Sequence, residues 1–215
     1  MPILLHLDSS ARGERSISRQ LTREFTDAWK KANPAGSIIY RDLGHNPVSL
    51  VNEPWIEASF SPPDALTPEL KSTLAVSDEL ISELEKADHY VFGVPMYNFS
   101  APAAFKAYID QIVRVGRTFN FSASGFEGLL KGKKVIIITS SGSVFRKGTP
   151  LESLNHQEPW LRTILGFIGL TEVDFIVADG LNDVNFGKID REQYLSAIRL
   201  KVLEKAGRPQ ISTGE

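Results

Sequence analysis

Short apolar runs alternate with longer stretches of helical periodicity along most of the chain. Five runs have the length and composition of buried strands: residues 3–5, 37–40, 89–94, 135–139 and 173–177. These runs are mainly apolar and do not alternate with polar residues, as strands do when both faces of their sheet are covered. The pattern therefore predicts a sheet with helices on both faces.

Apolar residues recur at intervals of three and four after these runs, which predicts amphipathic helices. Expected helices start near Ser16, at Thr67, near Ala103, near Trp160 and at Asp190. Thr67 has proline at the next position, and Asp190 stands three residues before a glutamine, so both resemble helix caps. Residues 44–66 are rich in Pro, Ser and Asn and predict an irregular excursion with one short helix.

Strict alternation of five strands with helices is typical of a doubly wound parallel sheet. With five strands the expected order is 2-1-3-4-5, the flavodoxin-like order, in an α/β fold. The chain has no internal repeat and no linker-like stretch. We therefore expect one domain over residues 1–215, with the excursion at about 44–66.

Composition narrows the chemistry. The 24 basic and 26 acidic side chains give a net charge of −2, which does not favour nucleic-acid binding. Cysteine is absent, which excludes disulfides, thiolate metal sites and a cysteine nucleophile, and no metal site is expected. The apolar runs are too short to span a bilayer, and the first residues do not resemble a signal peptide. A cytoplasmic location is the expectation.

Three loops should carry the chemistry, because ligands of such sheets bind beyond the carboxyl ends of the strands. The first contains Ser10 and leads into Ser16-Ile17-Ser18 at a helix start, where free N–H groups and hydroxyls suit a phosphate; capping alone explains it equally well. Neither a dinucleotide-binding glycine motif nor a P-loop is present.

The second loop follows the strand at 89–94 and places an aromatic residue and an amide, Tyr97 and Asn98, beside the sheet edge. It suits a flat heteroaromatic ligand, although a simple turn is the alternative. The third loop, residues 140–143, is small and carries Gly142, so a ligand could approach its backbone closely. By itself the third loop also fits an ordinary connection.

Together the three loops resemble those of the FMN-dependent NADH-azoreductases, also described as FMN-dependent NADH:quinone oxidoreductases. The resemblance covers essentially the whole chain, and its most specific part is the Pro-Met-Tyr-Asn-Phe segment at 95–99. Residues 125–129 and 165–169 also look like the family. One position departs: many members have Ser-Arg-Gly-Gly where this chain has Ser-Ser-Gly-Ser at 140–143, so Ser143 replaces a glycine.

The resemblance implies a homodimer with one FMN per subunit and NADH as electron donor. It implies a ping-pong cycle that reduces quinones and aromatic azo compounds, with the chemistry on FMN N5 and no catalytic side chain. The phosphate is expected to be held by hydroxyls and helix N–H groups without a basic patch. The implied cofactor-binding residues are Ser10, Ser16, Ile17, Ser18, Met96, Tyr97, Asn98, Phe99, Ser140, Ser141, Gly142 and Ser143.

Two aromatic residues, Phe119 and Phe167, are candidates to sandwich flat substrates, with core packing as the alternative for both. A flavodoxin-type one-electron carrier and a non-catalytic flavin-binding protein remain alternatives, although carriers are usually strongly acidic and this chain is not. A phosphorelay receiver needs an aspartate after the third strand, where this chain has Val94-Pro95-Met96. That alternative is therefore disfavoured.

Overall fold

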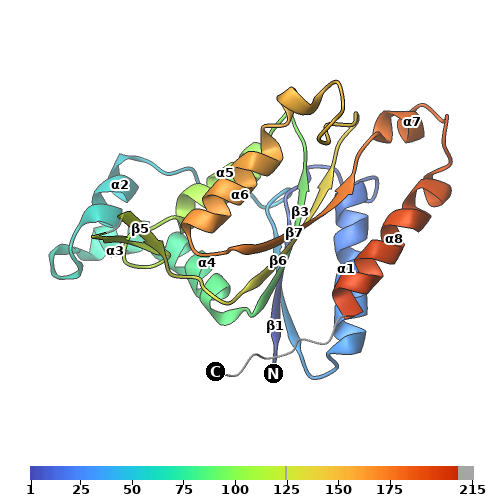
Figure 1. Cartoon of the computed structure of the whole chain (residues 1–215). Coiled ribbons are helices and arrows are strands. Elements are labelled where there is room, and N and C mark those ends of the chain that lie inside the picture. Colours follow the sequence, from blue (N-terminus) through green and yellow to red (C-terminus); the bar gives the residue numbers. More distant parts are fainter. Residues whose placement is uncertain (124, 208–215) are drawn as a thin grey trace.

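A parallel five-stranded sheet forms the centre of the computed structural model, which describes residues 1–123 and 125–207 (Figure 1). Neighbouring strands pair in parallel in the order β2-β1-β3-β6-β7. Because β4 (Phe119–Ser122) and β5 (Gly125–Gly128) lie outside this sheet, the order of its own strands is 2-1-3-4-5, and the predicted flavodoxin-like topology is confirmed. The sheet strands are β1 (Ile3–Asp8), β2 (Ser37–Asp42), β3 (His89–Pro95), β6 (Lys134–Ser140) and β7 (Glu172–Ala178).

Helices cover both faces of the sheet, as the apolar character of the strands predicts (Figure 1). One face carries α4, α5 and α6, and the other carries α1 and α8. Alternate residues of β3 point to opposite layers, so Phe92 packs on the first face and Val91 on the second. The five helices are α1 (Ile17–Ala32), α4 (Ala75–Lys86), α5 (Ala103–Ile112), α6 (Gln157–Phe167) and α8 (Arg191–Gly207).

Helix α1 begins where the sequence predicts, because the Ser16 side chain accepts a hydrogen bond from the Arg19 N–H at 3.4 Å. Its apolar stripe buries Leu21, Phe25 and Trp29 against the sheet. The last of the predicted caps is also present, since the Gln193 N–H donates to the Asp190 carboxylate at 3.0 Å. These local interactions fix the start of both helices on this face of the sheet.

The structure adds elements that the pattern did not predict. A two-stranded antiparallel hairpin follows α5. The predicted helix after Thr67 is divided in two at Leu74, whose side chain is buried in a cluster with Trp55. The remaining elements, predicted or not, are α2 (Glu53–Phe60), a 3-10 turn (Pro63–Ala65), α3 (Pro68–Thr73), β4 (Phe119–Ser122), β5 (Gly125–Gly128), a second 3-10 turn (Glu152–Leu154) and α7 (Leu181–Asn185).

The excursion after β2 is attached to α5 by a buried amide. The Trp55 indole N–H donates to the Gln111 side-chain oxygen at 2.8 Å, and the Gln111 amide donates to the Ser49 carbonyl at 2.9 Å. The predicted short helix in this excursion is α2. The predicted domain span of 1–215 includes residue 124 and residues 208–215, which lie outside the described residues. In the described part of the chain, no helix combines the length and apolar character needed to cross a membrane.

Candidate functional site

The three predicted loops leave neighbouring strands at the carboxyl edge of the sheet. Asp8 at the end of β1 pairs in register with Gly93, and Pro95 at the end of β3 pairs with Ser140. Backbone hydrogen bonds continue this contact beyond the strands, since the Met96 N–H donates to the Ser140 carbonyl at 2.8 Å. The loops are therefore held side by side by the sheet itself.

A cleft of about 120 Å³ lies between these loops and α7. The structure brings eight of the twelve predicted cofactor-binding residues to its lining: Ser10, Ser16, Ile17, Met96, Tyr97, Ser140, Ser141 and Gly142. Segments more than 120 residues apart in the sequence thus meet around one cleft. Their convergence at the predicted edge is the main geometric result of the structure.

Four predicted residues lie beside the cleft and not in its lining. Ser18 is buried behind Ser16, with 3.2 Å between the two hydroxyl oxygens. Asn98 and Phe99 form a turn with φ angles of 48° and 69°, in a conformation that is uncommon for residues other than glycine. Hydrogen bonds in both directions between Tyr97 and Ser100 close this turn.

Ser143, the fourth of these residues, faces α7. The Ser141 hydroxyl donates to the Ser143 carbonyl at 2.8 Å, and the Asn182 amide lies 3.5 Å from the Ser143 hydroxyl. A Cβ added at Gly142 would lie 2.6 Å from the Asn182 side-chain oxygen. A side chain at position 142 would therefore have to displace the exposed Asn182 side chain, and the serine that replaces a family glycine contacts the same asparagine.

The start of α1 offers donors for an anion at one end of the cleft. The N–H groups of Ile17 and Ser18 have no partner within the helix, as at any helix start. Ser10 and Ser16 add two hydroxyls. These residues are only 1% and 4% exposed, so the surrounding protein fixes their positions. Buried hydroxyls at a helix N-terminus form a suitable site for a phosphate group.

Three arginines, Arg12, Arg15 and Arg191, also line the cleft, and the sequence analysis did not predict them. The first two lie in the loop after β1, so their positive charge beside the predicted phosphate site could have been noticed in the sequence. Arg191 comes from the start of α8 and is held by Gln20 of α1, whose side-chain oxygen accepts its hydrogen bond at 2.8 Å. Basic side chains therefore lie beside the cleft, although the sequence analysis expects the phosphate to be held there without a basic patch.

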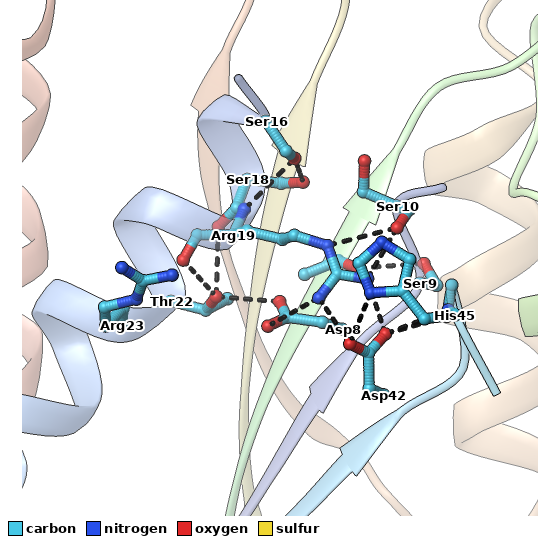
Figure 2. A network of polar contacts seen from close by, with 12 residues as sticks. Asp8, Ser9, Ser10, Ser16, Ser18, Arg19, Thr22, Arg23, Asp42 and His45 are labelled. Atoms are coloured by element: carbon cyan, nitrogen blue, oxygen red, sulfur yellow. Dashed lines mark hydrogen bonds and ion pairs between the residues drawn. The ribbon is translucent and has the colours of Figure 1, made fainter. Parts of the chain in front are cut away.

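A buried polar network lies directly behind Ser10 and connects β1, β2 and α1 (Figure 2). Arg19 is at its centre and donates to the Ser10 carbonyl from Nε at 3.1 Å and from Nη2 at 2.6 Å. Arg19 Nη1 also donates to Asp42 at 2.9 Å. Burial raises the pKa of Asp42, but hydrogen bonds from Arg19 and His45 lower it more strongly, to about 2.

Asp8, at the end of β1, is another buried member of this network. Its carboxylate accepts hydrogen bonds from Thr22 at 2.8 Å and from the Tyr40 hydroxyl at 3.2 Å, and lies 3.7 Å from Arg19. Burial and the negative charge of Asp8 raise the pKa of Tyr40 to about 12, so Tyr40 remains a neutral donor. The network is therefore a structural support behind the loop, with its polar groups paired.

Phe119 and Phe167, the candidate substrate residues, lie outside the lining of this cleft. Their rings pack against each other with centroids 4.6 Å apart, and both contact Phe126 of the hairpin. Within one chain they form an aromatic cluster between α6 and the hairpin. Their predicted contact with a substrate stays a prediction.

A larger cavity of about 430 Å³ lies at the opposite, amino-terminal end of the sheet, between Trp29, His89 and Lys205. Ligands of open parallel sheets bind at the carboxyl edge, so volume alone does not make this cavity the functional site. In the described residues, no group of three or more His, Asp or Glu side chains is arranged to hold a metal ion.

Comparison with known proteins agrees with this geometry. Residues 3–203 match a family model described as having a flavodoxin-like fold. An azoreductase from Bacillus anthracis has a TM-score of 0.86 and 27% identity, over 96% of this chain and 99% of that one. A second Bacillus anthracis structure, an FMN-dependent NADH-azoreductase in complex with FMN, has a TM-score of 0.84 at 22% identity, over 97% and 99% of the two chains. The fold and its cleft thus define a protein of the flavodoxin-like class.

Sequence similarity identifies the family within that class. An FMN-dependent NADH:quinone oxidoreductase of Trichormus variabilis is 56% identical over 197 residues, which cover 91% of this chain and 94% of the relative. Another from Nostoc punctiforme is 57% identical over 84% of this chain and 88% of its own length. The chain belongs to the family of FMN-dependent NADH:quinone oxidoreductases.

Proposed function

We propose that this protein is an FMN-dependent enzyme that oxidises NADH and reduces quinones and aromatic azo compounds. One observation carries the proposal: eight residues of the three family motifs, from loops distant in sequence, line a single cleft at the start of α1. The relatives at 56% and 57% identity carry the quinone oxidoreductase name, and a structural relative carries the azoreductase name.

The donors at the start of α1 fit the phosphate group of FMN. A phosphate monoester carries between one and two negative charges at neutral pH. The N–H groups of Ile17 and Ser18, with the hydroxyls of Ser10 and Ser16 and the cleft arginines, would donate hydrogen bonds to the phosphate oxygens. A phosphate here needs no strongly basic chain, which agrees with the net charge of −2.

The other two loops fit a flat ring. Met96 and Tyr97 lie along one side of the cleft and Gly142 along another, with backbone polar groups near the sheet edge. In this proposal residues 96–99 support the ring edge around N5 and O4, and residues 140–143 approach the side of N1 and O2. The turn at Asn98 and Phe99, with its positive φ angles, sets the direction of that backbone.

FMN, when bound, supplies the redox chemistry by taking two electrons from NADH and passing two electrons to the acceptor. The protein's own residues bind the phosphate, hold the ring edge and leave one side of the cleft for NADH and the acceptor in turn. Because the two substrates would use the same space, we propose that the cycle is ping-pong. A carrier would instead exchange single electrons with a protein partner.

Initial-rate kinetics test this proposal. Without an acceptor and without oxygen, the FMN-loaded protein should oxidise only the one equivalent of NADH that reduces its FMN, and continuous turnover should need a benzoquinone or an azo dye. Reciprocal plots at several NADH concentrations should be parallel. Intersecting lines would contradict the shared site. A protein that binds FMN but does not turn over NADH with any acceptor would favour the carrier or the non-catalytic alternative.

The assembly proposed with this function is a homodimer. The hairpin carries Phe121 and Phe126 with 65% and 63% of their surfaces exposed, and Phe60 at the end of α2 is 71% exposed. Apolar surface of this kind favours association. Light scattering after size-exclusion chromatography should give twice the chain mass, and a mass of 23.8 kDa would contradict the dimer.

A further inference from the structure

We propose that Arg19 is a positioning residue that fixes the Ser10 peptide group, so that the loop after β1 presents donors and not a carbonyl oxygen to the FMN phosphate. The inference rests on the proposed function for the identity of the ligand. It concerns a residue outside the cleft lining, which therefore acts through Ser10 and not by contact with the flavin.

The geometry of Arg19 is specific to a guanidinium group. Nε and Nη2 both donate to the single carbonyl oxygen of Ser10, at 3.1 and 2.6 Å. Nη1 and Nη2 also donate to the two carboxylate oxygens of Asp42. A planar group with five N–H donors can serve both acceptors at once, whereas the single ammonium group of a lysine cannot match this arrangement.

Asp42 holds the guanidinium in this orientation from the end of β2. It accepts hydrogen bonds from the Gly44 and His45 N–H groups, each at 3.1 Å, so the carboxylate is itself fixed by the backbone. Arg19 is 6% exposed, and the Asp42 side chain is 16% exposed. A buried ion pair with these additional hydrogen bonds has little freedom to move.

Charge neutralisation does not explain the role of Arg19. Two carboxylates, Asp8 at 3.7 Å and Asp42, face this one guanidinium, so little of its positive charge is left for a phosphate. The Ser10 carbonyl, in contrast, would repel a phosphate if the peptide group turned around. Holding that oxygen on the network side is the contribution that the contacts support.

The side chain of Ser10 connects the two ligand-binding loops. The Ser10 hydroxyl lies 3.4 Å from the Tyr97 hydroxyl and accepts the Arg12 N–H at 3.2 Å. A shift of Ser10 would therefore change the phosphate end of the cleft first and would reach the ring end through Tyr97. Such a shift should weaken binding of the FMN phosphate more strongly than binding of the ring.

Comparison of FMN with riboflavin separates this role from a general loss of structure. In the flavin-free protein, Arg19→Lys should weaken FMN binding by about tenfold or more, as expected for lost hydrogen bonds to a charged group. The dissociation constant of riboflavin, which lacks the phosphate, should change by less than about threefold. Arg23→Lys is the matched control, because Arg23 lies one turn further on α1 and its ion pair among the described residues is with the exposed Glu14.

Amide hydrogen exchange gives a second readout that does not depend on flavin. Exchange of residues 9–12 should be faster in Arg19→Lys than in the wild type and in Arg23→Lys, and Asp42→Asn should act in the same direction. Unchanged exchange with unchanged FMN binding, or equal losses of FMN and riboflavin, would overturn the inference. A wild-type protein that binds neither flavin would instead refute the proposed function, while the exchange result would still decide the role of Arg19.

Discussion

Substitution of Gly44 by alanine gives a sharp test of the support behind Ser10. A Cβ built at Gly44 would lie 1.9 Å from the Ser10 carbonyl oxygen and 2.5 Å from its carbonyl carbon. Uncharged heavy atoms normally stay about 3.5 Å apart, so one backbone would have to move by about 1.5 Å. Gly44 is not among the glycines with positive φ, so alanine itself is not strained there and the clash is the whole effect.

The expected cost follows from this overlap. The two closest atoms belong to the backbone, and Arg19 Nη2 would lie 2.6 Å away, so rotation of a side chain cannot relieve the overlap. Overpacking of this kind costs about 1 to 3 kcal/mol of unfolding free energy. Urea denaturation should show a lower midpoint with an unchanged slope. FMN binding to the same variant should weaken by about tenfold or more, because 1.4 kcal/mol of lost contact corresponds to that factor.

Gly13→Ala is the matched control for this experiment. Gly13 lies in the loop after β1, and an added Cβ would have nothing within 4 Å, so stability and FMN affinity should stay near wild type. Wild-type stability and FMN affinity in the Gly44→Ala variant would refute the reasoning. That result would mean that the Ser10 carbonyl can be displaced without consequence for the cleft.

Three further predictions concern stability. The pKa of Asp42 is lowered to about 2, so its ion pair with Arg19 stabilises the fold above pH 4. The unfolding free energy should fall by about 1 to 2 kcal/mol as the pH decreases from about 4 to 2. Urea denaturation at a series of acid pH values should show a smaller fall in the Asp42→Asn variant. Trp55→Phe should lower the unfolding free energy by about 1 to 3 kcal/mol in urea, because the buried Gln111 oxygen loses its donor. Leu161→Ala, at a fully buried position, should cost about 2 to 5 kcal/mol by the same assay, and a cost below 1 kcal/mol would contradict the packing of α6.

The sheet and its order could be predicted because apolar residues recur with different periods in strands and helices, and because the strands are buried on both faces. Local capping residues such as Ser16, Thr67 and Asp190 also gave the helix starts, since each interaction spans only three residues. The hairpin at Phe119 was missed because its strands are four residues long, although the alternation of Phe and polar residues there is a weak signal.

The candidate site was predictable only as far as it lies in loops that follow strands. Position alone assigned Ser10 and Tyr97 to one edge, and the resemblance to a family supplied the rest. Arg191 could not be predicted, because it reaches the cleft from a helix 180 residues beyond Ser10 through tertiary packing. The role of Arg19 was hidden for a similar reason, since Arg19 lies on helix α1 and its partner Asp42 lies at the end of strand β2.

The central claim is that the cleft holds FMN for two-electron transfer from NADH to a quinone. The most direct test is an anaerobic titration of the FMN-loaded protein, followed by its visible absorption. One equivalent of NADH should bleach the flavin band completely, and one equivalent of a benzoquinone should then restore it. A band that NADH leaves unchanged, or a bleached band that the quinone does not restore, would contradict the claim.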